Sequence, residues 1–302
     1  MADPIYIIGS SNTDMVIKSE RLPTPGETIL GGTFLMNAGG KGANQAVAAA
    51  RLGGNVTFIT RVGNDLFGQQ SLQQFKKENI HTQFISIDKN HPSGIALINV
   101  DAKGENCITV ASGANGQIFP ETLNGFFNEL KSPAVVLIQL EIPLVTVEYI
   151  IEECAKRNIS AILNPAPANR IQESSLKKLF AITPNETEAQ GLTGVRIHND
   201  DSAGEAAAVL HKKGMQRVII TLGKRGAYWS DGKNSGFHTS PSVTAVDTTA
   251  AGDCFNGALV VALAEGKSLP ESVAFACQAA SISVTRMGAQ ASMPFRKELK
   301  LS

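Results

Sequence analysis

The chain has 302 residues, 43% of them hydrophobic, which is enough for one large core or two ordinary ones. Lysine plus arginine and aspartate plus glutamate number 27 each, so no net charge attracts nucleic acid or an anionic membrane surface. No apolar run approaches the roughly 18 residues that span a bilayer, and the N-terminal segment lacks the basic region of a signal peptide. We therefore expect a cytoplasmic protein without nucleic acid or membrane as a partner.

The cysteines point to the same compartment. Cys107, Cys154, Cys254 and Cys277 lie far apart, with no C-x-x-C pair and no matching histidine cluster for zinc. Buried free thiols are the interpretation that this spacing favours. A reducing cytoplasm would keep them in that form.

Apolar runs alternate with amphipathic stretches along the chain. The run from Ile5 to Ile8 predicts a buried strand that leads into a polar loop carrying Asn12 and Asp14. Further strands are expected at 56–60, 134–140, 160–163, 181–183, 218–222 and 227–230, and helices at 44–52, 145–157 and 200–213. This alternation is typical of a mostly parallel sheet wrapped by helices, in which ligands bind at the carboxyl ends of the strands.

Two segments depart from this alternation. Residues 15–36 contain prolines and short alternating runs, and residues 94–111 predict a hairpin whose turn contains Gly104. Together they predict a small sheet apart from the main body. Because no flexible linker or repeat is present, we expect one domain over 1–302, with the small sheet formed from about 13–36 and 94–112.

A corner of small residues precedes an apolar helix near residue 250. Ala250, Ala251 and Gly252 would let a phosphate approach the positive end of that helix closely. Asp253 then has two interpretations. It could cap the first turn, which is worth about 1 kcal/mol. It could also be a general base that takes a proton from a hydroxyl attacking the bound phosphate.

Two motifs at opposite ends of the chain carry a family resemblance. The segment Asp247-Thr-Thr-Ala-Ala-Gly-Asp253 resembles the D-T-x-A-A-G-D signature of the ribokinase-type sugar kinases, and Asn37-Ala-Gly-Gly-Lys-Gly-Ala-Asn-Gln-Ala46 resembles their N-terminal signature. A P-loop is disfavoured because Lys41 is followed by Gly42 and Lys224 by Arg225. The resemblance implies a three-layer α/β/α ribokinase-like sandwich with a mostly parallel central sheet. It also implies a β-sheet lid over the sugar that pairs subunits into a homodimer.

The resemblance further implies that ATP phosphorylates D-ribose at O5, the entry step of ribose catabolism. Asp253 would be the general base, and the N–H groups of Ala250, Ala251 and Gly252 would hold the transferred phosphoryl group. The sugar pocket would be formed by Asn12, Asp14, Gly40, Lys41, Gly42, Asn44, Glu141 and Asp253, because carboxylates and amides suit hydroxyl ligands. Taken singly, Asp14 could merely cap a turn and Glu141 could be a solvated strand end.

The same resemblance assigns the nucleotide and the ions. Asn185 and Glu188 would arrange Mg²⁺ around the ATP phosphates, although this spacing alone is more often a helix cap with a surface acid. ATP would lie against Thr221, Leu222, Gly223, Lys224, Arg225, Gly226, Gly252 and Asp253, with Cys277 at the adenine. K⁺ would be bound by main-chain oxygens of Thr249, Ser283, Arg286 and Gly288 and by the side chains of Asp247 and Ser292.

Two other functions stay open at this point. A sugar-binding or regulatory protein could keep the fold and lose catalysis, but the intact Asp253 argues against it. A kinase for deoxyribose, a nucleoside or pseudouridine is the second. The pocket residues can form hydrogen bonds with hydroxyl groups, but their types do not show which sugar the pocket excludes.

Overall fold

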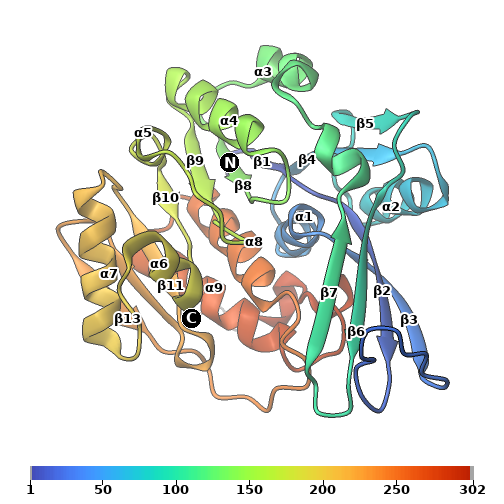
Figure 1. Cartoon of the computed structure of the whole chain (residues 1–302). Coiled ribbons are helices and arrows are strands. Elements are labelled where there is room, and N and C mark those ends of the chain that lie inside the picture. The colour runs from blue at the N-terminus through green and yellow to red at the C-terminus, as the bar shows by residue number, and fades with distance from the viewer. Residues whose placement is uncertain (1, 300–302) are drawn as a thin grey trace.

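The computed structural model describes residues 2–299, with helices on both sides of a large sheet and a smaller sheet to one side (Figure 1). The strands of the large sheet are β1 Ile5–Ile8, β4 Val56–Gly63, β5 Ile85–Asp88, β8 Val135–Ile138, β9 Ser160–Leu163, β10 Ala181–Ile182, β11 Val218–Thr221, β12 Ala227–Ser230 and β13 Ser235–His238. The α-helices are α1 Lys41–Arg51, α2 Leu66–Lys77, α3 Asn124–Glu129, α4 Leu144–Lys156, α5 Glu173–Leu176, α6 Glu186–Thr193, α7 Asp200–Lys212, α8 Ala251–Ala264 and α9 Leu269–Ser283.

The large sheet is mostly parallel, as predicted. Its strand order is β13-β12-β11-β10-β9-β8-β1-β4-β5. The strands from β11 to β5 run parallel, whereas β12 is antiparallel to both of its neighbours. The carboxyl ends of the parallel strands therefore meet at one edge of the sheet, where ligands bind in such folds.

Alternate residues of the central strands belong to two separate cores. In β8, Val135 and Leu137 pack in the core that contains α1, α8 and α9. Val136 and Ile138 pack in the opposite core, which contains α4 and α7. Because both faces are covered, β8 is apolar and buried at all four of its positions. The predicted three-layer α/β/α sandwich is confirmed.

The small sheet consists of β2 Asn12–Lys18, β3 Thr33–Gly39, β6 Gly94–Val100 and β7 Asn106–Ala111, in the order β3-β2-β6-β7. The chain passes from β1 into β2, and β3 runs directly into the turn before α1 (Figure 1). The predicted strands and hairpin are confirmed, with β3 extending to Gly39 beyond the predicted limit of 36. The prediction of a polar loop carrying Asn12 and Asp14 is wrong, because both residues belong to β2 and pair with β3 and β6. The small sheet is thus joined to the large one at the edge where ligands bind.

Several features differ from the prediction. Helix α1 begins at Lys41 rather than at residue 44, because Gly40 adopts a φ of 87° and turns the chain into the helix. Strands β5 and β13 were not predicted; both lie at the sheet edges, where short, partly polar strands carry little apolar signal. All four cysteines are free, but Cys107 is exposed on β7 and not buried as predicted.

Within residues 2–299, every helix is too short or too polar to cross a bilayer. The longest, α9, has 15 residues. Its buried side includes Val273, Phe275 and Ala276, which pack in the core shared with α1 and α8. Its apolar character therefore serves the core of this fold.

Candidate active site

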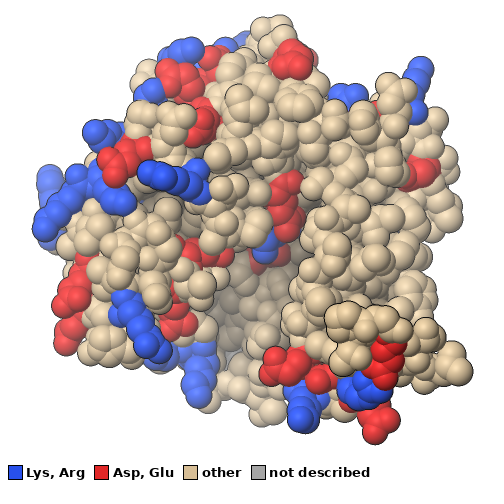
Figure 2. Space-filling view, viewed as in Figure 1, with Lys and Arg blue, Asp and Glu red and all other residues tan. Residues whose placement is uncertain are grey.

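A cleft lies at the carboxyl end of the large sheet, between the helical body and the small sheet. Figure 2 shows this face hollowed, with acidic and basic side chains inside the hollow. Three cavities open along it: about 350 Å³ on the side of the small sheet, about 210 Å³ in the centre and about 350 Å³ beyond. The central and far cavities share Asn185, Thr221, Ala251 and Gly252 in their walls, so they lie next to each other.

Asp253 lies in the wall of the central cavity, at the third residue of α8, and only 6% of the residue is exposed. One carboxylate oxygen accepts a hydrogen bond from Asn44 Nδ2 and the other from Gln45 Nε2, each at 2.9 Å. Burial raises the pKa of Asp253 above its ordinary value, although Lys41 and these two donors oppose the shift. A carboxylate of raised pKa at a cavity wall is suited to take a proton from a hydroxyl.

The N-terminus of α8 faces the same cavity. The chain enters it through Ala250, whose φ of 58° is left-handed, and no side chain caps the helix. The N–H of Ala251 donates to the Thr248 carbonyl at 3.2 Å, whereas that of Gly252 has no backbone acceptor within residues 2–299. Of the predicted phosphate cradle, Gly252 therefore offers a free N–H at the positive end of the helix.

Glu141 follows β8 and contacts the start of α1. Its carboxylate accepts hydrogen bonds from Ser10 Oγ at 2.5 Å and from the Lys41 N–H at 2.9 Å. Burial lowers the pKa of the Lys41 ammonium, but the carboxylates of Asp253, Glu141, Glu188 and Asp14 outweigh burial and raise it. Lys41 is therefore a cation coupled to all the carboxylates of the cleft.

Asp14 projects from β2 toward the same cation. Burial, with the charges of Glu141 and Asp253, raises the pKa of Asp14 from 3.8 to about 6, and Lys41 opposes this. The carboxylate lies over the bare Cα of Gly39, where a Cβ would overlap it. Asp14, Glu141 and Asp253 thus share one electrostatic environment, which is the arrangement that the kinase interpretation requires.

The turn before α1 depends on glycine. A Cβ on Gly42 would come 2.7 Å from the backbone of Gly9 and Ser10, and one on Gly40 would come 2.7 Å from the Asn12 nitrogen. These contacts bring the start of α1 against the end of β1. The two predicted glycines therefore allow the close contact between the start of α1 and the segment that joins β1 to β2.

Asn12 lines the cavity on the side of the small sheet, whereas Asn44 lines none of the three cavities. The Asn44 Oδ1 is buried and has no partner within residues 2–299. Asn12 Oδ1 accepts from Asn115 Nδ2 at 2.7 Å, and Asn115 also accepts from the Ser11 N–H at 2.9 Å. Asn115 lines the same cavity as Asn12 but was not predicted, because a lone asparagine in a loop gives no signal in one sequence.

Asn185 and Glu188 form a capping box at the start of α6. Asn185 Oδ1 accepts from the Glu188 N–H at 2.8 Å, and Glu188 Oε2 accepts from the Asn185 N–H at 2.9 Å. Both also line the central cavity, and burial raises the pKa of Glu188. The motif therefore caps α6 and also forms part of the cavity wall. Glu188 is buried and is not the surface acid that the spacing alone would suggest.

The predicted nucleotide residues divide between the far cavity and other surroundings. Thr221, Gly223, Gly226 and Cys277 line the cavity, and burial raises the pKa of the Cys277 thiol to about 12. Leu222 is buried in the hydrophobic core, Lys224 is exposed, and Arg225 donates to Glu186 at 2.7 Å.

The predicted cation loop lies against the approach to α8. Asp247 accepts from the Thr249 N–H and from the Gly288 N–H, both at 2.9 Å. Burial raises the pKa of Asp247, but the hydrogen bonds from Thr249 and Gly288 outweigh it and hold the pKa below its ordinary value. The hydroxyls of Ser283 and Ser292 donate to Ala280 and Ala289, and Arg286 pairs with Glu298. No cluster of three or more His, Cys, Asp or Glu side chains suited to a metal occurs within residues 2–299.

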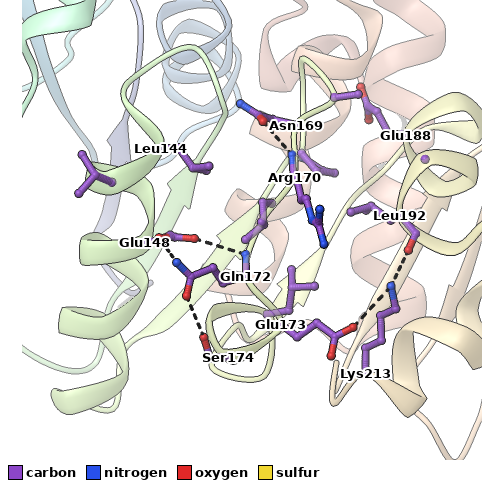
Figure 3. A pocket seen from close by; sticks show the side chains of 16 residues that line it. Leu144, Glu148, Asn169, Arg170, Gln172, Glu173, Ser174, Glu188, Leu192 and Lys213 are labelled. Atoms are coloured by element: carbon purple, nitrogen blue, oxygen red, sulfur yellow. Dashed lines mark hydrogen bonds and ion pairs between the residues drawn. The ribbon is translucent and has the colours of Figure 1, made fainter.

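A separate cavity of about 1020 Å³ lies beside the cleft, between α4, α6 and the segment around α5 (Figure 3). Arg170 points into it, and Lys213 Nζ donates to the Leu192 carbonyl at 2.8 Å. Among the predicted site residues only Glu188 reaches its wall. The predicted residues that line a cavity therefore all line the cleft, and Glu188 also reaches this larger cavity.

The comparisons with known proteins agree with this geometry. Residues 3–296 match the family described as pfkB family carbohydrate kinase, so the chain belongs to that family. Ribokinases of Haemophilus influenzae and Bacillus subtilis are 43% and 41% identical to it, covering 99% and 98% of this chain and 97% and 98% of theirs. A structure of Arabidopsis thaliana ribokinase complexed with ribose and ATP superposes with a TM-score of 0.90 at 34% identity, covering 98% of this chain and 97% of that one.

Proposed function

We propose that the chain transfers the γ-phosphoryl group of ATP to O5 of D-ribose, giving D-ribose 5-phosphate and ADP, as the entry step of ribose catabolism. The ribokinase relatives supply the substrate class. The observation that carries the proposal is the placement of Asp253, buried beside the uncapped start of α8 and coupled to Asp14 and Glu141 across one cleft. A binding protein would have no use for a buried base at an anion site.

In the proposed reaction Asp253 accepts the proton of the 5-hydroxyl. O5 then bonds to the γ-phosphorus while the bond from that phosphorus to the β,γ-bridging oxygen breaks, and ADP leaves. The free N–H of Gly252 and the positive end of α8 stabilise the charge that develops on the phosphoryl oxygens. Lys41, close to the carboxylates of the cleft, adds a positive charge on the sugar side.

ATP would occupy the central and far cavities, with its adenine near Cys277 and its phosphates between Thr221 and Gly252. Asn185 and Glu188 fit Mg²⁺ held through water, because Glu188 is buried and one of its oxygens is free of hydrogen bonds within residues 2–299. When bound, Mg²⁺ would neutralise part of the phosphate charge.

K⁺ would lie between the approach to α8 and the loop after α9. The N–H groups of Val246 and Asp247 donate to the Val284 carbonyl, and Gly288 donates to Asp247, so main-chain oxygens of both segments come close together. Such oxygens, with an ionised Asp247, are ligands suited to a hard cation. The predicted set is Asp247, Thr249, Ser283, Arg286, Gly288 and Ser292.

We further propose that residues 1–302 form one domain in which the small sheet is a lid that also pairs two subunits. Register places Met15, Met36 and Leu97 on its outer face with Ile17 and Phe34, and the exposed fractions of Phe34 and Leu97 exceed half. An apolar face of this kind is expected to be covered by a second copy. Four free thiols support a cytoplasmic location.

A substrate panel tests the proposed function. ADP release would be followed with D-ribose, 2-deoxyribose, nucleosides and pseudouridine at equal concentration. We expect the highest kcat/KM with D-ribose and a loss for 2-deoxyribose, because pocket groups left without their hydroxyl partner are costly. Equal or better turnover of another substrate would contradict the assignment of ribose, and no ADP release with any of them would contradict a kinase.

A further inference from the structure

Gln45 on α1 is fully buried and donates to Asp253, but it does not line the cleft. Its residue is 0% exposed and is absent from the linings of the three cavities. Its Nε2 donates to Asp253 Oδ1 at 2.9 Å and to Asn164 Oδ1 at 3.0 Å. Because Gln45 does not line the cleft itself, it can influence the transfer only through the two residues of the central cavity wall to which it donates, Asp253 and Asn164.

The far end of the Gln45 amide is also held by a protein group. Its Oε1 accepts a hydrogen bond from Gln139 Nε2. Gln139 has little freedom of its own, because it packs on the bare Cα of Gly9, where a Cβ would overlap Gln139 Oε1. If the Gln45 amide were reversed, its oxygen would face the Asp253 carboxylate with no proton between two acceptors. Asp253 Oδ1 and Asn164 Oδ1 both accept from Gln45 Nε2, so these two acceptors fix which end of the amide is the donor. Gln139 holds the other end, and its own Oε1 is buried without a partner within residues 2–299.

The two amides on α1 that hold Asp253 differ in their other contacts. Asn44 donates to Asp253 Oδ2, and its own Oδ1 is buried without a partner within residues 2–299. Gln45 has both ends engaged by protein groups. Each carboxylate oxygen of Asp253 thus accepts one N–H from α1. The other lone pairs of the carboxylate remain available to a ligand in the central cavity.

We propose that Gln45 is a positioning residue for the phosphoryl transfer, held at its far end by Gln139, and that it directs the Asp253 carboxylate toward the cleft. This inference rests on the proposed role of Asp253 as general base. The charged groups that face Asp253 are Lys41 on α1, Glu141 after β8, Asp14 on β2 and Glu188 on α6. All four remain when Gln45 is changed, so a change in titration would report the lost donor.

The test is the pH dependence of kcat/KM for ribose. Gln45→Met keeps the length of the side chain and removes the donor. We expect the acidic limb to move to higher pH by on the order of one unit, because a carboxylate that loses an N–H donor holds its proton more tightly. We expect plateau kcat to fall by about 10- to 100-fold, with the KM for ribose and for ATP unchanged.

Gln139→Met is a second, independent test of the inference, because Gln139 donates to Gln45 and has no hydrogen bond to Asp253. It should move the acidic limb in the same direction but less far. The double variant should shift no further than Gln45→Met alone, since Gln139 acts through Gln45. The matched control is Gln74→Met, a partly buried glutamine on α2 that donates to Glu78 at 2.9 Å and should leave the profile unchanged.

An acidic limb that stays in place in both variants would overturn the inference, and so would shifts that add in the double variant. If thermal unfolding shows that Gln45→Met does not fold, the position of the acidic limb in the pH profile of Gln139→Met alone decides whether the inference holds. Asp253→Asn distinguishes a failure of the proposed function from a failure of the present inference. If that variant turns over normally, the proposed function fails; if it is inactive while both Met variants keep the wild-type limb, only the present inference fails.

Discussion

Asp14 is the cleft residue whose charge should change within an accessible pH range. Its pKa is raised from 3.8 to about 6, first by burial and then by Glu141 and Asp253. Below pH 6 the carboxyl becomes protonated and can no longer accept two hydroxyl hydrogen bonds at charge-assisted strength. We therefore predict that ribose affinity, measured by calorimetry, falls as the pH drops through 6. Asp14→Asn should bind weakly at every pH, and a wild-type pH dependence in that variant would assign the titration to another group.

The same shift has a consequence for stability. Because the folded chain holds the Asp14 proton more tightly than the unfolded chain does, this residue makes the fold less stable as pH rises from about 4 to above 6. Asp14→Asn removes that effect. We predict a gain in the free energy of unfolding on the order of 1–2 kcal/mol at pH 7.5 after screening is allowed for, and almost none near pH 4. Denaturant unfolding at the two pH values would show whether the gain depends on pH in this direction.

Helices α1 and α8 carry the amides and the carboxylate of the site, so their separation matters. A Cβ on Gly257 of α8 would come 2.7 Å from the Gln45 carbonyl oxygen and from Ala48 Cβ. Gly257→Ala should push the helices apart, lower stability by about 1–3 kcal/mol and reduce kcat by roughly tenfold or more, because the donors withdraw from Asp253.

Gly204→Ala on α7 is the matched control for this helix substitution. The nearest neighbours of its new Cβ are atoms of Tyr228, at 3.5 Å or more, so no contact is tight. Alanine should then stabilise α7 by about 0.5–1 kcal/mol without altering turnover. Equal kinetics in the Gly257 and Gly204 variants would show that the α1 to α8 spacing does not govern the site.

At the scale of the whole molecule, the sequence predicted the elements that have a strong apolar periodicity and the site residues that belong to recognisable motifs. The central strands and the small sheet follow from apolar runs and turn residues, and Asp14, Lys41, Glu141 and Asp253 came from motifs that the fold brings into one cleft. Gln45 was predicted only as part of the N-terminal signature and of the helix at 44–52. Its partners Gln139 and Asn164 follow different strands, so only the tertiary fold joins the three. Edge strands β5 and β13 were missed because they bury little.

The assembly can be tested on the outer face of the small sheet. Phe34→Glu introduces a charge among exposed apolar side chains of that face, where the proposed second copy would pack. We predict that sedimentation at micromolar concentration shows a dimer for the wild type and a monomer for the variant. Leu66→Glu, at an exposed apolar residue of α2, should leave the mass unchanged. A monomeric wild type would contradict pairing through this sheet.

The central claim concerns one carboxylate at the start of α8, and Asp253→Asn tests it most directly. The amide keeps the size of the side chain but cannot accept the proton of the 5-hydroxyl. The variant should bind ribose with near-wild-type affinity by calorimetry, while kcat for ADP release falls by about 10² to 10⁴ or more. Turnover close to that of the wild type, in a variant that binds ribose normally, would contradict the account.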